Sequence, residues 1–437
     1  MSPSSRSVIV AVMAQTDLSP DAGSAPLQRE ATRRHLEDTL RSWLGAGRGV
    51  EIPALPAVYA RQLLRLEEYE RPERDAWGCW DYEHSESHRV GLLREPTIDR
   101  WVAERRRSFG SAGLLPLWPT GKRFAVCLTH DVDLVSTAST LRQVGRFARA
   151  GRAPGVAGRH EAVARLARPP VRVLRSLGHR IARSPSTTRT MERSLAVEAE
   201  RGAFASYFFT VPPGTHRSRY DCVYAPDDRC TFRGRRVRIV DLMRALDAEG
   251  HDVGLHGSYG AALEAGALTA ERTFLQNATG LEITTTRQHF LRWDVRYSAA
   301  HQEAAGLRAD SSLGFNRNVG FRAGTSLPFH AFDVDRSRRL GLLEVPLVIQ
   351  DTALLGPAAL ALDLDAARAL VADRIDAIAD VQGVATLLFH PDKLARPDWL
   401  ALYEFALDHA LDRGGWLTSL RTLHEWWTAR ETALLEA

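Results

Sequence analysis

Acidic and histidine side chains follow the first apolar segment of the sequence, and their types fit hydrolytic chemistry. His130, Asp131 and Asp133 come directly after the run 124–128. If the strand conformation continues, Asp131 and Asp133 project to the same side, because alternate residues of a strand share a face. Two adjacent carboxylates repel unless a cation or an arginine lies between them. The pair therefore predicts one metal ligand beside one general base; the alternative is a loop in which an aspartate caps the following helix.

Histidines also follow later apolar runs. His256 comes after 252–255 and precedes a glycine, a placement that fits a metal ligand. Arg287 and His289 lie two residues apart, so they can share one face at a strand end. Arg287 would then lie near a carboxylate and His289 near a metal ion; the alternative for Arg287 is an ordinary buried ion pair.

His390 ends the last of these runs, at 384–389, and is followed by a proline. A protonated histidine at this place can give its proton to a leaving group, with Asp392 orienting it. The alternative is a hydrogen-bonded histidine at a strand terminus, with the proline ending the strand.

From residue 122 onward, short apolar runs alternate with helical patterns. Buried parallel strands read as continuous apolar runs, and apolar residues at a period of 3.6 indicate helices. This alternation favours a parallel sheet, open or closed as a barrel, with functional residues at the carboxyl ends of its strands. The predicted strands are 124–128, 205–211, 252–255, 283–286, 343–349 and 384–389; the predicted helices are 31–45, 190–201, 240–249, 269–279, 297–305, 363–379 and 399–413.

Four motifs stand in a fixed order along this part of the chain. They are Thr-His-Asp-Val-Asp at 129–133, Gly-His-Asp-Val-Gly-Leu-His at 250–256, an arginine at a strand end, and Leu-Leu-Phe-His at 387–390. Their order resembles that of the NodB-type polysaccharide deacetylases, over roughly 122–425, and is most similar to a divergent branch with this first motif. The resemblance implies a distorted (β/α)7 barrel and one divalent metal ion, zinc in the first place, with cobalt, nickel or manganese as alternatives.

The resemblance also implies a role for each matching residue. Asp131 corresponds to the general base and Asp133 to a metal-binding carboxylate, while His256 corresponds to a metal-binding histidine. Arg287 corresponds to the arginine that steadies the base, and His390 to the catalytic acid. The implied reaction removes an acyl group, usually acetyl, from an amino sugar of a glycan or of a lipid- or nucleotide-linked saccharide.

Two departures from the family pattern concern the metal and the substrate. The second motif lacks the second metal-binding histidine, because Gly260 stands four residues after His256. His289 is the expected substitute, and His130 is a weaker candidate. The sequence around Arg287 also replaces the family's Arg-x-Pro motif, which changes the expected substrate groove.

Three residues near these motifs are candidates to contact the substrate. They are Trp293, which could stack on a sugar ring, together with Tyr259 and Asp392. The alternative for Trp293 is a place in the core.

The chain divides by composition into three parts. Residues 1–30 are expected to be disordered, 31–121 to form an α-rich N-terminal accessory module, and 122–437 to form the catalytic domain. Within the last part, 141–190 holds twelve arginines and the single acid Glu161. This insertion could lie on an anionic membrane surface; the alternative is a solvated helical insertion whose arginines pair with acids elsewhere. Nucleic-acid binding is disfavoured, because no nucleic-acid module accompanies the charge.

Composition limits the remaining possibilities. The net charge of +4 is small for 437 residues and implies no acidic partner by itself. Cys222 and Cys230 could pair, but free thiols are expected in a chain with no clear secretion signal. No stretch approaches the ~20 apolar residues of a membrane span. We therefore expect a cytoplasmic protein, and 141–190 would allow peripheral contact with a membrane.

Three other functions stay open at this point. The same scaffold could hydrolyse a C–N bond of a small cyclic imide or ureide, for which a narrow pocket would be evidence. The protein could instead be a metal-free binding or scaffolding homologue. It could also be a membrane-peripheral accessory protein that uses the arginine-rich insertion.

Overall fold

The computed structural model describes residues 25–71, 73–75, 77–110, 114–135, 187–212, 218 and 220–436. Most of the predicted disordered start and most of the basic insertion 141–190 lie outside these residues. No helix of the described residues is long and apolar enough to cross a membrane.

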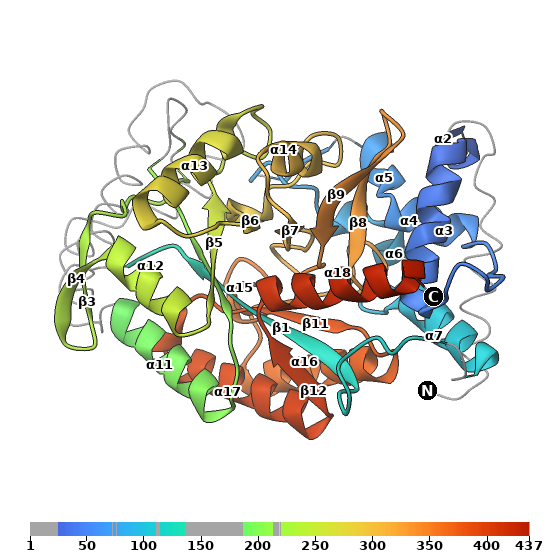
Figure 1. The fold of residues 1–437 in the computed structure, drawn as a ribbon. Helices are drawn as coiled ribbons and strands as arrows, with labels where there is room; N and C mark the ends of the chain where they lie inside the picture. The colour runs from blue at the N-terminus through green and yellow to red at the C-terminus, as the bar shows by residue number, and fades with distance from the viewer. Residues whose placement is uncertain are drawn as a thin grey trace.

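A curled, largely parallel sheet forms the centre of the molecule, with helices around it (Figure 1). Its hydrogen-bonded order is β10-β11-β1-β2-β5-β6-β7-β9-β8, and β12 pairs with β1. All pairs are parallel except β8 with β9. The strands are β1 Phe124–Val132, β2 Ser206–Phe209, β5 Asp252–Gly257, β6 Thr285–Gln288, β7 Ala309–Asp310, β8 Phe329–Asp333, β9 Arg338–Glu344, β10 Ile349–Gln350, β11 Val384–Leu388 and β12 Gly415–Thr418.

One chain segment closes this sheet into a ring. Strand β9 pairs with β7, and β10, a few residues further on, pairs with β11 at the other edge. Between them lies Pro346, which has no N–H to donate and interrupts the strand predicted at 343–349. The segment therefore changes partners instead of continuing along β7. Counting β9 and β10 as one member, seven parallel members close the ring, and the predicted distorted (β/α)7 barrel is confirmed.

Helices lie between successive strands, as the alternating sequence pattern predicts. The predicted helices at 190–201, 240–249, 269–279, 297–305, 363–379 and 399–413 all form, within a few residues of the expected ends. They are α11 Thr187–Glu200, α12 Ile239–Ala248, α13 Ala267–Thr279, α14 Ser298–Ala304, α16 Leu364–Asp380 and α17 Pro397–Asp412; the short α15 Asp351–Leu355 and the long α18 Leu420–Glu436 complete the barrel. A two-stranded hairpin, β3 Arg229–Phe232 and β4 Arg235–Arg238, projects at the edge shown at the left of Figure 1.

Strand β1 fixes the centre of the barrel. All nine of its residues are buried, and it pairs with β2, β11 and β12. Because its neighbours run parallel to it, their carboxyl ends open on the same side as its own. The residues that follow these strands must therefore meet at one mouth of the barrel.

The residues before the barrel form short helices that pack on the side of β8 and β9 (blue in Figure 1). Their apolar residues belong to the same buried cluster as those of the barrel. The indole nitrogen of Trp43 donates to the Pro328 carbonyl at 2.7 Å, and Trp118 packs against Trp427 of α18. These helices are α2 Ala25–Gln28, α3 Glu30–Leu44, α4 Ala57–Leu63, α5 Leu66–Glu70, α6 Glu86–Arg89 and α7 Thr97–Phe109.

A buried ion cluster joins these helices to the barrel. The carboxylate of Glu68 accepts hydrogen bonds from Arg65 and from both Nε and Nη2 of Arg322, the latter two at 2.8 Å. Trp80 and Trp293 each pack against the Arg322 guanidinium. Burial alone would raise the pKa of Glu68, but Arg322 and Arg65 together lower it to about 2. Arg65 compensates part of the Glu68 charge from within the same segment, and Arg322 adds the rest only while the two parts are docked.

We expect Glu68→Gln to lower the free energy of unfolding by about 3–5 kcal/mol, because it leaves two buried guanidinium groups without their carboxylate. The matched change Glu70→Gln breaks the half-exposed pair with Arg61 and should cost no more than about 1 kcal/mol. Urea unfolding of both variants measures the difference. Equal losses would contradict the stabilising role of the buried cluster.

The same pair predicts an acid dependence of stability. The pKa of Glu68 is lower in the folded chain, about 2, than its ordinary value of 4.5. Its contribution is therefore complete above about pH 4.5 and is lost as the pH falls toward 2. Between about pH 4.5 and pH 2, the difference in urea midpoint between the wild type and Glu68→Gln should shrink as the pH is lowered in steps.

Candidate active site at the mouth of the barrel

The predicted site residues do meet at the carboxyl ends of the strands. Asp131 and Asp133 lie at the end of β1, and His289 and His390 come just after β6 and β11. These four side chains line one cavity of about 530 Å³ that opens to solvent. The remaining wall is formed by Trp77, Phe290, Leu291, Asn316, Arg317, Gln350, Thr352, residues 356–359, Lys393, Arg396 and Trp399.

Asp133 is the centre of the histidine cluster. Its Oδ1 lies 3.3 Å from Nε2 of His256 and 3.7 Å from Nε2 of His289. Its Oδ2 lies 3.9 Å from Nε2 of His390. Three imidazole nitrogens from three strand ends thus face one carboxylate.

The electrostatics of these groups differ, although the three histidines are all buried and Asp133 is only partly exposed. Burial alone would raise the pKa of Asp133, but the surrounding histidines hold it well below its usual value. The pKa of His289 is lowered to about 4, mainly by burial, so this imidazole is neutral near pH 7. Burial also works against a charge on His256, but Asp131 and Asp133 outweigh it and raise the pKa of that histidine. A neutral His289 beside an ionised Asp133 is the protonation state that a metal site requires.

Asp131 lies close to His256 and to Arg287, the arginine of the third motif. Nη1 of Arg287 lies 3.8 Å from Oδ1 of Asp131, and His256 lies 3.9 Å from Oδ2. The guanidinium is anchored by a 2.9 Å hydrogen bond from Nη2 to Ser311 and by packing against Phe208. Arg287 thus places its guanidinium beside Asp131 in a fixed orientation.

His390 is oriented by Asp351, a residue that the sequence analysis missed. Asp351 Oδ1 binds Nδ1 of His390 at 2.8 Å, and Oδ2 accepts the backbone N–H of His390 at 2.7 Å. Burial alone would lower the pKa of His390, but Asp351 and the two site aspartates raise it to about 10. Asp392, the partner considered from sequence, instead binds Lys393 at 2.5 Å. With Nδ1 occupied by Asp351, His390 is protonated near pH 7 and its Nε2 faces Asp133.

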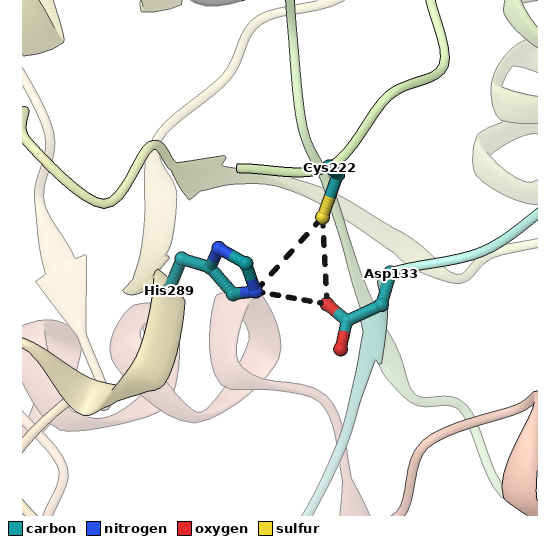
Figure 2. A group of neighbouring side chains, drawn as sticks. All are labelled: Asp133, Cys222 and His289. Atoms are coloured by element: carbon teal, nitrogen blue, oxygen red, sulfur yellow. Dashed lines mark hydrogen bonds and ion pairs between the residues drawn. The ribbon is translucent and has the colours of Figure 1, made fainter. Parts of the chain in front are cut away.

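Cys222 is a second residue that the sequence analysis did not place in the site. It lies on the connection between β2 and β3, and its thiol is free, as are those of the other three cysteines. Figure 2 shows its sulfur pointing at Asp133 and His289, which lie 3.7 and 3.9 Å away. Together these three residues form a group whose ligand atoms all lie within 4.8 Å of one another. Burial and the neighbouring Asp133 raise the pKa of the Cys222 thiol well above its ordinary value.

The backbone that carries His289 is strained. Phe290 and Leu291 have φ angles of 61° and 50°, a left-handed conformation that costs residues with a Cβ about 1–3 kcal/mol each. The carbonyl of Phe290 accepts hydrogen bonds from the Cys79 thiol at 3.1 Å and from the Asn316 amide at 2.7 Å. The turn that positions His289 is therefore held partly by the segment that precedes the barrel.

Three other predicted residues lie away from the cavity wall. His130 turns to the opposite side, where its ring nitrogens bind the Phe389 carbonyl and Glu198 at 2.6 and 2.8 Å. Trp293 is buried against Arg322. The Tyr259 hydroxyl donates to the Trp77 carbonyl at 2.7 Å. Tyr259 therefore supports Trp77, which does line the cavity and which the sequence analysis did not single out.

The donor set fits a divalent metal ion. One buried atom at this cluster, Nε2 of His256, has no hydrogen-bond partner among the described residues, although it lies 3.3 Å from Oδ1 of Asp133. A buried polar atom without a partner is unfavourable, and a cation beside these donors would remove that cost. Carboxylate, imidazole and thiolate together suit zinc and similar ions better than magnesium or calcium. His130 is excluded from this set because both its ring nitrogens are engaged elsewhere.

Comparisons with known proteins were made on sequence and on structure. The sequence matches no family model and no curated protein. The structure is similar to a protein from Mycobacterium smegmatis assigned as a polysaccharide deacetylase, with a TM-score of 0.47 and 18% identity over 72% of this chain and 93% of that one. It is also similar to Puue allantoinase, with a TM-score of 0.46 and 15% identity over 74% and 95% of the two chains.

A third structure, assigned as a polysaccharide deacetylase of Pseudomonas aeruginosa PAO1, gives a TM-score of 0.42 and 14% identity over 74% of this chain and 97% of that one. At these TM-scores and identities, the three structures are reported as similar, and no property of theirs is assigned to this chain. The barrel is established by its own strand order, and the candidate site by its own geometry.

We expect Asp133→Ala and His289→Ala each to weaken zinc binding by roughly 100-fold or more. Loss of a residue that only supports a metal ligand can already cost roughly 100-fold, and these two residues are proposed as ligands. His409→Ala is the matched control, since His409 lies on the outer helix α17 and binds Asp376 of α16. Metal per chain is measured by mass spectrometry after zinc loading and desalting. Full retention of zinc in the Asp133→Ala protein would rule out this cluster as the metal site.

Proposed function

We propose that the protein is a metal-dependent hydrolase of C–N bonds that removes an acyl group, in the first place acetyl, from an amino sugar. One observation carries the proposal: a buried acid, Asp131, and a buried histidine, His390, line one cavity together with the candidate metal ligand Asp133. Each has its own charged partner, Arg287 or Asp351. Amide hydrolysis needs this combination, because water must lose a proton while the leaving nitrogen gains one.

A divalent ion held by Asp133, His256 and His289 would supply Lewis acidity, lowering the pKa of water from ~15.7 toward ~7 and polarising the amide carbonyl. Asp131 accepts the proton of the attacking water while the water oxygen forms a bond to the carbonyl carbon. Arg287, 3.8 Å from Asp131, orients the carboxylate for that step. His390 gives its Nε2 proton to the nitrogen as the C–N bond breaks. The products are a free amine and a carboxylic acid.

The cavity supports a saccharide substrate. About 530 Å³ accommodates one or two sugar rings, and Trp77 and Trp399 provide aromatic surface at its wall. The indole nitrogen of Trp399 has no hydrogen-bond partner among the described residues although the side chain is buried. Because that nitrogen is itself buried, a sugar would contact the ring of Trp399 and not its N–H group.

Release of acetate from N-acetylated sugars tests the activity directly. The purified, zinc-loaded chain is assayed with short N-acetylglucosamine oligomers and with a nucleotide-linked N-acetyl sugar. Hydantoin and allantoin are assayed in parallel. Acetate release supports the proposal; hydrolysis of the cyclic compounds alone would replace it with a small-molecule C–N hydrolase, and inertness toward all of them would favour a binding protein.

Asp131→Asn should reduce kcat by about 10²–10⁴-fold, because asparagine cannot accept the proton of water. The zinc content should stay near that of the wild type, since Asp131 is proposed as base and not as ligand. The exposed Asp380 at the end of α16 provides the control Asp380→Asn. Wild-type turnover by Asp131→Asn would remove this residue from the mechanism.

Asp351→Asn should move the alkaline limb of the pH profile to lower pH. The His390 pKa is raised to about 10, with Asp351 the leading cause of the increase. A proton donor is active below its pKa, so the wild-type rate should fall only near pH 10. Without the carboxylate the His390 pKa drops, and the fall should begin several pH units earlier.

The matched change Asp392→Asn should leave this limb in place, because Asp392 binds Lys393 and not His390. The rate is followed as kcat/KM from pH 5 to 10.5. Superimposable alkaline limbs for Asp351→Asn and wild type would contradict the role of His390 as the proton donor.

A further inference from the structure

We propose that the thiolate of Cys222 is a ligand of the metal ion, together with Asp133 and His289. The inference rests on the proposed metal-dependent function and goes beyond it, because it adds a sulfur ligand at the place where the sequence lacks a second histidine. It also predicts which metals the chain selects.

The distances among the three side chains carry this inference. Sγ of Cys222 lies 3.7 Å from Oδ1 of Asp133 and 3.9 Å from Nε2 of His289, and the latter two atoms are 3.7 Å apart. Ligands at ~2.0–2.3 Å from a tetrahedral ion are separated by about 3.3–3.6 Å from one another. The observed triangle is only a few tenths of an ångström wider than that.

The three residues come from separate parts of the barrel and converge on one point. Figure 2 shows Asp133 just beyond the end of its strand, His289 on the turn after β6, and Cys222 entering from the connection after β2. Local sequence therefore does not explain their approach. His256 adds a fourth donor, since its buried Nε2 lies 3.3 Å from the same Asp133 oxygen and has no hydrogen-bond partner in the described part of the chain.

A buried cysteine is more often a small core residue, so the other three provide the comparison. Cys127 lies inside β1, Cys230 lies in the β3–β4 hairpin, and the Cys79 sulfur donates to backbone carbonyls. Within the described ranges, Cys222 alone belongs to a group that could hold a metal ion. Cys222 belongs to the main buried apolar cluster, but its sulfur also faces a carboxylate and an imidazole.

A sulfur ligand makes the site softer. Thiolate binds zinc and cobalt strongly, whereas magnesium and manganese prefer carboxylate, carbonyl and water oxygens. We therefore expect the full-length chain to bind Zn²⁺ and Co²⁺ in preference to Mn²⁺ and Mg²⁺. The connection between β2 and β3 would then be tethered to the ion through Cys222.

Cobalt spectroscopy of the full-length chain tests the assignment without an activity assay. The chain is stripped with a chelator and titrated with Co²⁺ alone while the near-ultraviolet and visible spectra are recorded. A thiolate ligand gives a sulfur-to-cobalt charge-transfer band in the near ultraviolet. We expect this band in the wild type and in the control Cys230→Ser, and its loss in Cys222→Ser, together with at least tenfold weaker zinc binding.

Zinc X-ray absorption of the wild-type chain provides a readout that needs no variant. One sulfur scatterer at about 2.3 Å would support the proposal, in contrast to a shell of nitrogen and oxygen alone at about 2.0–2.1 Å. If cobalt and zinc bind but neither method detects sulfur, Cys222 is not a ligand and the proposed hydrolase function stands. If the wild-type chain binds neither metal, both proposals fail.

Discussion

Strand β1 and its parallel neighbours share one direction, and this constraint decides where every ionisable side chain of the site lies. β1 is buried along its whole length and hydrogen-bonded to β2, β11 and β12. A slip of one residue would turn Asp131 and Asp133 to the other side of the sheet. The same packing forces three carboxylates into one buried region, where they would repel. Arginine and histidine side chains at the neighbouring strand ends compensate that charge. Arg287 faces Asp131, three histidines face Asp133, and His390 binds Asp351.

Much of this architecture follows from the sequence because its pattern is simple. Continuous apolar runs mark the longer buried strands, and the period of 3.6 marks the helices between them. The two-residue strands β7 and β10 are too short to form a pattern, and β8, β12 and α18 were not predicted. Ring closure was also hidden, because it depends on Pro346 interrupting a run that reads as one strand. The interruption is visible only in the folded chain, where the segment pairs first with β7 and then with β11.

The site was predictable as far as its residues follow strand ends. That rule selects Asp131, Asp133 and the histidines at the ends of β5, β6 and β11. It also applies to Asp351, which directly follows β10 at the end of the run 343–349. Cys222 follows no such run, so only the folded chain brings it to the cluster. Trp293 lies near the motifs in sequence, but it takes the core place given as its alternative, with its ring against Arg322, whose binding to Glu68 is a long-range contact.

The hydrogen bond from Cys79 to the Phe290 carbonyl makes the segment before the barrel part of the candidate site. It links the segment before the barrel to the turn that carries His289, and the same segment supplies Trp77 to the cavity wall. Undocking this segment would leave Asp131 and His390 on their strands yet release the strained turn and widen the entrance. The described residues before the barrel and the barrel therefore build the candidate site together.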